Sequence, residues 1–284
     1  MSEPVGVVAP GRVAVVTGAA SGIGLGLCQR FAAEGMRVVM ADVVEAAALE
    51  EAAAGLARRG AAVRPVLADV SRPEQVESLR DEAVRAFGAV HLLCNNAGVG
   101  GPHDPLWLIG RGDWDWVMGV NLGGVINGIR AFVPLLLEQD AAHIVNTASV
   151  FGLFAGALGP YGISKHAIVA LSETLHFQLR ALGAAVGVSV LCPGAVRTNF
   201  GTSARNRPAS AGPVLAPGAG ARASAERFAR LAAGGLDPAE VAGIVVDGIR
   251  GGRFYILTSS NRNHAVRRRA EEILGGGPPA PPFP

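Results

Sequence analysis

Runs of apolar, mostly β-branched residues alternate along the chain with longer stretches that are rich in alanine or amphipathic. The short runs predict strands, and they occupy residues 13–16, 38–40, 63–67, 90–94, 143–147 and 186–192. Strands that are apolar on both faces belong to parallel sheets covered by helices, and the intervening stretches are long enough for helical crossovers. The pattern therefore predicts an α/β fold: a doubly wound central parallel sheet flanked by helices on both faces.

The alternation stops between residues 201 and 235, where alanine, glycine, serine, proline and arginine prevail. Because this stretch is too long for an ordinary connection, we expect either a lid over the substrate or a disordered excursion. A helix over residues 237–249 and a last short strand at 254–257 follow. We expect one domain over residues 1–275, with the lid at 201–235, and a disordered Gly/Pro-rich tail at 276–284.

The composition narrows the class of partner. With 284 residues and 50% hydrophobic content, the chain can bury one large core. The net charge is +2 and the two signs are interspersed, which favours a small-molecule partner over nucleic acid. Cys28, Cys94 and Cys192 have no partner at ligand spacing, so we expect buried thiols, no disulfide framework and no metal site. No leader is recognised and no apolar run reaches about 18 residues, so we expect a soluble cytoplasmic protein with no membrane partner.

A glycine-rich turn follows the first predicted strand and precedes a predicted helix. Gly18, Gly22 and Gly24 stand there in the order Gly-x-x-x-Gly-x-Gly. Such a turn lets the backbone approach a pyrophosphate, which the free N–H groups and the dipole of a helix N-terminus attract. We predict a dinucleotide-binding loop that also includes Ser21 and Ile23. A mere tight turn is the alternative, because the chain contains 39 glycines.

Asp42 ends the second predicted strand, where dinucleotide-binding folds place a carboxylate for the adenosine ribose. A carboxylate accepts hydrogen bonds from both ribose hydroxyls and repels a 2′-phosphate. Ser21 and Val43 stand where cationic side chains usually receive that phosphate. The sequence thus favours NAD as the cofactor and makes NADP less favoured, while a helix N-cap is the alternative role for Asp42.

Tyr161 and Lys165 stand at i, i+4 spacing on one face of a predicted helix. Oxidising an alcohol needs a base for the hydroxyl proton, and a nearby ammonium favours the phenolate form of tyrosine. Lys165 is the one lysine among the 25 lysine and arginine residues, and arginine would not replace a proton-exchanging ammonium. We predict that Tyr161 is the general acid or base and that Lys165 lowers its pKa and binds the cofactor ribose. A generic solvated lysine is the alternative.

The glycine spacing and the Tyr-x-x-x-Lys pair resemble the classical short-chain dehydrogenase/reductase family, over about residues 12–257. The resemblance implies a Rossmann-type domain and roles for further residues. It implies that the adenosine side of the site is formed by Asp69, Val70, Asn96, Ala97 and Gly98. It implies that the nicotinamide is seated by Pro193, Gly194, Val196 and Thr198.

The same resemblance implies that Ser149 hydrogen-bonds the substrate oxygen and that Asn121 holds a water in a proton relay from Lys165. Ser149 precedes Tyr161 by 12 residues, one fewer than the commonest family spacing. This difference leaves the shape of the substrate loop open more than the chemistry. A strand-end turn for Ser149 and a buried helix position for Asn121 are the alternatives.

These features predict an NAD(H)-dependent oxidoreductase that interconverts a secondary alcohol and a ketone by hydride transfer. Phe151, Leu153, Phe154 and the lid suggest an apolar substrate pocket. The alternatives are an NADP-dependent carbonyl reductase of the same family and a catalytically silent dinucleotide-sensing or scaffold protein. The resemblance further implies a homo-oligomer, a tetramer or a dimer, with apolar surface at residues 132–137 and 168–179.

Overall fold

The computed structural model describes residues 6–156, 158–213, 216–259 and 263–280 of the chain. A seven-stranded sheet forms the centre of this part, with the strand order β3-β2-β1-β4-β5-β6-β7 and every neighbouring pair parallel. The strands are β1 (Val13–Thr17), β2 (Arg37–Asp42), β3 (Val63–Leu67), β4 (Leu92–Asn95), β5 (Ala142–Thr147), β6 (Val186–Cys192) and β7 (Tyr255–Leu257). The predicted doubly wound parallel sheet is confirmed. Its order reverses between β1 and β4, which is where open α/β sheets bind ligands.

The apolar runs predicted the strand positions to within a few residues. The largest difference at a strand start is in β4, which begins at Leu92 although Val90 was expected to start the strand. Val90 is buried, but it precedes the ladder with β1, whose register pairs Ala14 with Leu92. His91 fills the gap, because its N–H donates to the Val13 carbonyl and its Nδ1 accepts from the Val13 N–H.

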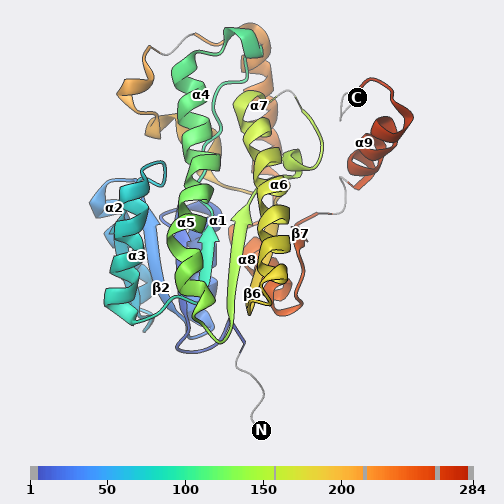
Figure 1. Cartoon of the computed structure of the whole chain (residues 1–284). Coiled ribbons are helices and arrows are strands. Elements are labelled where there is room, and N and C mark those ends of the chain that lie inside the picture. The colour runs from blue at the N-terminus through green and yellow to red at the C-terminus, as the bar shows by residue number, and fades with distance from the viewer. Residues whose placement is uncertain (1–5, 157, 214–215, 260–262, 281–284) are drawn as a thin grey trace.

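Two layers of helices cover the sheet (Figure 1). One face is covered by α1 (Gly22–Ala33), α2 (Ala46–Ala57) and α8 (Pro238–Arg250), and the other by α3 (Pro73–Phe87), α5 (Gly124–Leu137) and α6 (Gly159–Ala181). Phe31 of α1 and Phe132 of α5 are fully buried on opposite faces. At the predicted start of α8, Asp237 forms a capping box with Glu240.

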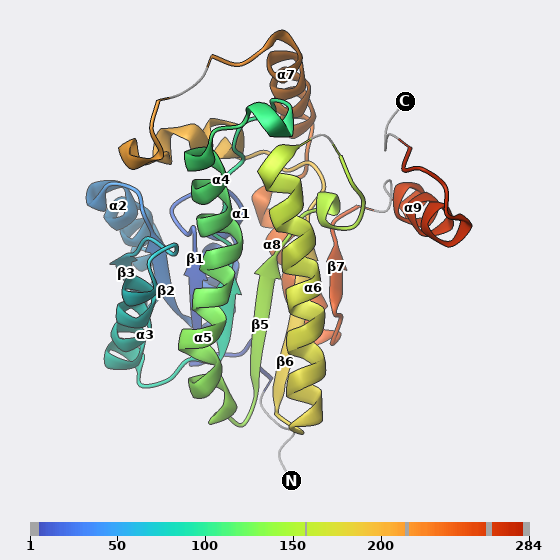
Figure 2. The same cartoon turned by 45° about the horizontal axis from the view of Figure 1, so that its top comes forward.

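A continuous helical stretch, Arg111–Leu137, is long and apolar enough by composition alone to cross a membrane. In this fold it consists of α4 (Arg111–Met118), the π-helical turn η2 (Gly119–Gly123) and α5. Figures 1 and 2 show its α5 part lying over the sheet between α3 and α6. Phe132 and Leu136 are completely buried there, so part of its apolar surface belongs to the core.

The segment without hydrophobic periodicity is largely helical. It contains the short 3-10 helices η4 (Asn199–Asn206) and η5 (Ala209–Ala211) and the alanine-rich helix α7 (Ala219–Ala233). Figure 2 shows these elements above the carboxyl ends of the strands, next to α4 and α6. The segment therefore lies over the ends of the strands, where a lid over a ligand cleft would lie.

The C-terminal helix α9 (Asn263–Gly275) lies at the side of the molecule (Figure 1). It contacts the rest through buried Ala265 and through Arg269, which donates a hydrogen bond to the Leu153 carbonyl. Residues 276–280 are exposed and form neither helix nor strand, and the rest of the predicted disordered tail, 281–284, lies outside the described residues.

Candidate active site

The glycine loop between β1 and α1 has the shape that a pyrophosphate requires. Gly18 and Gly22 have φ values of +65° and +53°, which favour glycine. A Cβ on Gly24 would lie 2.0 Å from the Gly18 carbonyl oxygen, so a side chain there would push the turn open. Ser21 is the N-cap residue of α1 and offers no side-chain cap, which leaves the N–H groups of the first turn available to an anion.

Asp42 stands at the end of β2 with its carboxylate fixed by backbone groups. Its Oδ2 accepts from the Ala20 N–H at 2.9 Å, and its Oδ1 accepts from Val43 and Val44. It does not cap a helix, because α2 begins at Ala46 after Glu45. A carboxylate has about four lone-pair sites, so this one keeps capacity for a ribose hydroxyl.

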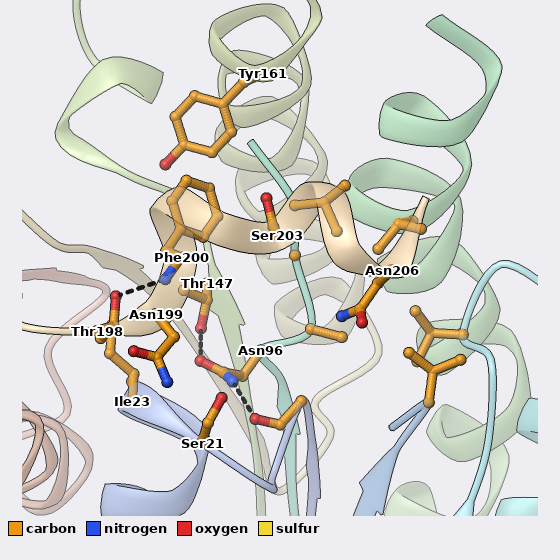
Figure 3. A pocket seen from close by; sticks show the side chains of 18 of the residues that line it. Ser21, Ile23, Asn96, Thr147, Tyr161, Thr198, Asn199, Phe200, Ser203 and Asn206 are labelled. Carbon is orange, nitrogen blue, oxygen red and sulfur yellow. Dashed lines mark hydrogen bonds between the residues drawn. The ribbon is translucent and has the colours of Figure 1, made fainter. Parts of the chain in front are cut away.

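Asn96 ties the ends of three neighbouring strands together. Its Nδ2 donates to the Thr17 carbonyl at the end of β1. Its Oδ1 accepts from the Thr147 hydroxyl at the end of β5, as Figure 3 shows. The Thr17 hydroxyl in turn accepts from the N–H groups of Asn96 and Ala97. These bonds hold open the crevice at the strand ends. The glycine turn, the fixed carboxylate and this crevice fit a dinucleotide.

Ser149, Tyr161 and Lys165 lie together at one side of this crevice. Ser149 follows β5, whereas Tyr161 and Lys165 occupy the first turns of α6, and all three are buried. The Lys165 Nζ donates to the Thr147 carbonyl at 2.8 Å and lies 5.7 Å from the centre of the Tyr161 ring. Three of the four residues that the sequence predicted as catalytic are therefore neighbours.

Burial is the main cause of the pKa shifts of Tyr161 and Lys165. It raises the pKa of Tyr161 to about 12, although a hydrogen bond with the Ser149 side chain acts in the opposite direction. Burial lowers the pKa of Lys165 to about 8. The sequence led us to expect a lowered pKa for Tyr161. Its pKa is raised instead, because the loss of hydration outweighs the hydrogen bond with Ser149.

Asn121 lies in the π-helical turn η2, completely buried. Its side chain exchanges hydrogen bonds with the N–H and the carbonyl of Val99, and its Nδ2 also donates to the Ser164 hydroxyl. Because the amide is used in this way, Asn121 connects the loop after β4 to α6. It does not line the cleft, so any part in a proton relay would have to use its backbone rather than its side chain.

The family model of the short chain dehydrogenases matches residues 12–209, more than half of the chain. The chain belongs to the short-chain dehydrogenase family. Its curated relatives include the 1-deoxy-11-beta-hydroxypentalenate dehydrogenase of Streptomyces exfoliatus, 40% identical over 276 residues, which cover 96% of this chain and 92% of that protein. The 3beta-hydroxysteroid dehydrogenase 2 of Eggerthella lenta is 37% identical over 197 residues, which cover 69% of this chain and 75% of that one.

The fold of this short-chain dehydrogenase is shared by a solved family member from Burkholderia phymatum, whose crystal structure is a complex with NAD. The two chains superpose with a TM-score of 0.94 at 43% identity, over 97% of this chain and 98% of the other. The short-chain dehydrogenase from Novosphingobium aromaticivorans superposes with a TM-score of 0.78 at 32% identity, over 96% of this chain and 89% of that one. The relatives are dehydrogenases, so this chain is an oxidoreductase of that family.

The cleft of the short-chain dehydrogenase, about 810 Å³ in volume, brings together nearly all residues predicted from the sequence. Those that line it are Gly18, Ser21, Gly22, Ile23, Asp42, Asp69, Val70, Asn96, Ala97, Gly98, Ser149, Tyr161, Lys165, Pro193, Gly194, Val196 and Thr198. Gly24 and Asn121 lie behind its wall, and both support lining residues.

The apolar side of the cleft is formed partly by the predicted lid, which supplies Phe228 and Leu231, and partly by Trp116 and Phe200, which the sequence did not point to. The Phe200 ring lies 5.3 Å from the Tyr161 ring and 5.9 Å from the Phe228 ring, and Trp116 and Leu231 complete an apolar wall. Figure 3 shows Phe200 on η4 next to Tyr161. The sequence gives no signal for this aromatic contact, because residues 201–235 contain a single aromatic residue, Phe228.

The predicted aromatic pocket around residues 151–154 is only partly present. Phe151 lines the cleft, but Leu153 and Phe154 do not. Phe154 is instead buried in a cluster with Val150 and Ala265 of α9. The prediction for these two residues was wrong because the loop after Ser149 turns through the 3-10 helix η3 (Val150–Gly152) and directs them away from the cleft.

Proposed function

We propose that this chain is an NAD(H)-dependent dehydrogenase that interconverts a secondary alcohol and a ketone, with Tyr161 as the general acid or base. The observation that carries the proposal is the buried neighbourhood of Ser149, Tyr161 and Lys165 at the edge of a dinucleotide-shaped crevice. No other tyrosine competes for the role, because Tyr255, the second in the chain, is half exposed on β7 and donates to Glu173.

In this proposal, side chains of the protein orient the substrate and transfer the proton. The Ser149 hydroxyl orients the substrate oxygen, and the Tyr161 hydroxyl gives its proton to a carbonyl or takes one from an alcohol. Lys165 holds positive charge beside the phenol and hydrogen-bonds the cofactor ribose. When bound, the nicotinamide cofactor supplies the donor or acceptor of the hydride.

Asp42 supports NAD rather than NADP. Its carboxylate is fixed by Ala20, Val43 and Val44 at the edge of the crevice, so it cannot turn away from a 2′-phosphate. The similar protein from Burkholderia phymatum was crystallised with NAD. NADP remains the second candidate because Arg72 also lines the cleft and carries a charge that a 2′-phosphate attracts.

The substrate that we propose is an apolar secondary alcohol or its ketone. The wall formed by Phe200, Phe228, Trp116 and Leu231 supplies apolar contact beside the Tyr161 hydroxyl. Two of the relatives are named for hydroxylated substrates, 1-deoxy-11-beta-hydroxypentalenate and a 3beta-hydroxysteroid. We infer a substrate with a bulky apolar skeleton and one reacting hydroxyl.

Calorimetric titration with NADH and with NADPH tests the cofactor, and turnover of a panel of cyclic secondary alcohols tests the reaction. Tyr161→Phe should abolish turnover and leave NADH affinity nearly intact, because only the proton-exchanging oxygen is lost. Tyr255→Phe is the matched control and should keep full activity. Turnover by Tyr161→Phe would disprove the role of Tyr161, and failure to bind either dinucleotide would favour a scaffold without catalysis.

We also propose that the chain forms a homo-oligomer through α5 and α6. The residues available for this contact differ from those expected, because Phe132, Leu136, Ile168 and Leu179 are buried in the core. The exposed apolar side chains on these helices are instead Ile126, Leu137, Ile163 and Phe177. Light scattering at micromolar concentration should find a dimer or tetramer, and a monomer alone would reject the proposal.

A further inference from the structure

A short segment of the chain caps the mouth of the cleft next to Tyr161. We call residues 199–212, which include η4 and η5, the capping segment. Near its start Phe200 packs on Tyr161, and further along the Ser203 hydroxyl accepts a hydrogen bond from the Gly100 N–H at 2.9 Å. Figure 3 shows Phe200, Ser203 and Asn206 in succession along this segment. Its position thus sets the distance between the apolar wall and the predicted acid or base.

Arg207 connects the capping segment to α4. Its Nε donates to Asp113 of α4 at 2.7 Å, and its two terminal nitrogens donate to the carbonyls of Gly212 and Ala211 at 2.7 and 2.9 Å. The side chains of Arg207 and Asp113 are only 9% and 14% exposed. Every nitrogen of the guanidinium is therefore engaged, in a largely water-excluded position.

The segment and α4 also meet backbone to backbone. A Cβ on Gly112 would lie 2.1 Å from the Ala211 carbonyl oxygen, so the close approach depends on glycine at that position of α4. The same helix carries Trp116, which lines the cleft. Since α4 leads directly into η2 and α5, it offers a fixed base for the segment.

Arg207 itself does not line the cleft, although its neighbours Arg205, Asn206 and Pro208 do. We propose that Arg207 is a positioning residue: its ion pair with Asp113 holds the capping segment against Tyr161 and so determines the shape of the substrate pocket. This role rests on the proposed function, since it matters only if a substrate occupies that pocket. Breaking the pair releases Phe200 and Ser203 from their positions without altering the proton-transferring groups.

Hydrogen exchange read by mass spectrometry tests the anchoring without substrate or cofactor. In Arg207→Ala the amides of residues 199–212 should exchange about tenfold faster, while those of the central strands keep their protection. Asp113→Asn, which keeps the side-chain shape and removes the charge, should act in the same direction. Arg111→Ala is the control, because Arg111 pairs with Asp115 on the same helix but is 88% exposed.

Kinetics then separate positioning from a general structural role. With an alcohol that the wild-type protein oxidises, Arg207→Ala should raise KM by about tenfold and change kcat by less than about threefold, because the pocket and not the chemistry is disturbed. Arg207→Lys should fall between Arg207→Ala and the wild type, since a lysine can pair with Asp113 but cannot also reach both carbonyls.

Unchanged exchange of residues 199–212 in Arg207→Ala would overturn the proposal, and so would faster exchange spread over the whole sheet. A local loss of protection with unaltered KM would show anchoring without positioning and would equally overturn it. Should Arg207→Ala fail to fold, Arg207→Lys and Asp113→Asn carry the same comparison. A protein that binds no dinucleotide refutes the proposed function, whereas the exchange result is independent of that outcome.

Discussion

Lys165 carries an ammonium in a place that destabilises the protein. Its side chain is 3% exposed, and burial lowers its pKa from 10.5 to about 8. Between these two values the unfolded chain binds more protons than the folded one, so the free energy of unfolding rises with pH across this window. A shift of about 2.5 pKa units at about 1.4 kcal/mol each corresponds to about 3 kcal/mol. This is the destabilisation expected at neutral pH.

Replacing Lys165 with methionine removes the buried charge and keeps most of the volume. Below pH 8 the variant should be more stable than the wild type by up to about 3 kcal/mol, less about 1–3 kcal/mol for the Thr147 carbonyl that loses its donor. The change of this difference with pH is the clearer test, because the cost of leaving the Thr147 carbonyl without a donor does not depend on pH. Between pH 8 and 10.5 the wild type should gain about 3 kcal/mol of stability relative to the variant, because the buried ammonium loses its proton. Tyr161 titrates in both proteins and cancels.

Urea unfolding at pH 7, 8, 9 and 10 measures this difference. Because Lys165 is the one lysine in the chain, ¹⁵N-lysine labelling gives a single side-chain amine signal, whose shift should titrate near pH 8. A midpoint near the ordinary 10.5, or a stability difference that does not change with pH, would refute the reasoning.

Three further predictions concern other parts of the same framework. Burial lowers the pKa of His143 to about 4, so acidification from pH 6.5 to 4 should cost about 3 kcal/mol of stability in the wild type and clearly less in His143→Gln; equal slopes in urea unfolding would contradict this. Gly24→Ala should lose about 2–3 kcal/mol of stability and weaken NADH binding through the clash with Gly18. Gly55→Ala in α2, where a Cβ meets only the end of the Arg58 side chain at 3.8 Å, should gain about 0.5–1 kcal/mol. Thermal unfolding that ranks the two variants the other way would be inconsistent with the glycine turn. Asp42→Asn should narrow the NADH over NADPH preference by about tenfold in calorimetry, and an unchanged ratio would exclude the carboxylate as its cause.

The cofactor side of the cleft could be predicted from the sequence because local rules determine it. A strand followed by Gly18 and Gly22 needs positive φ values there, and a carboxylate at the end of the next strand falls at the same edge of a parallel sheet. The i, i+4 spacing placed Tyr161 and Lys165 on one helical face for the same kind of reason. These residues required no knowledge of distant contacts.

The substrate side could not be predicted in this way. Arg207 and Asp113 are 94 positions apart, and neither stands in a periodic or recognisable pattern. Phe200 contacts Tyr161 from η4, where the Ser203 hydroxyl accepts a hydrogen bond from the Gly100 N–H, 103 positions earlier in the chain. The pKa of Tyr161 failed to follow the sequence argument for a related reason, since spacing indicates that an ammonium is near but does not show how much water is excluded.

Burial moves the two titrating groups in opposite directions, and this bears on the proposed reaction. A phenol with a pKa of about 12 is almost entirely protonated near neutral pH, which is the form that donates a proton to a carbonyl. Lys165, with a pKa of about 8, is still largely charged there. This protonated form agrees with the role of proton donor that we propose for Tyr161 in ketone reduction. In the direction of alcohol oxidation, the proposal assigns stabilisation of the phenolate to the charged Lys165, 5.7 Å from the Tyr161 ring centre, while burial opposes the phenolate.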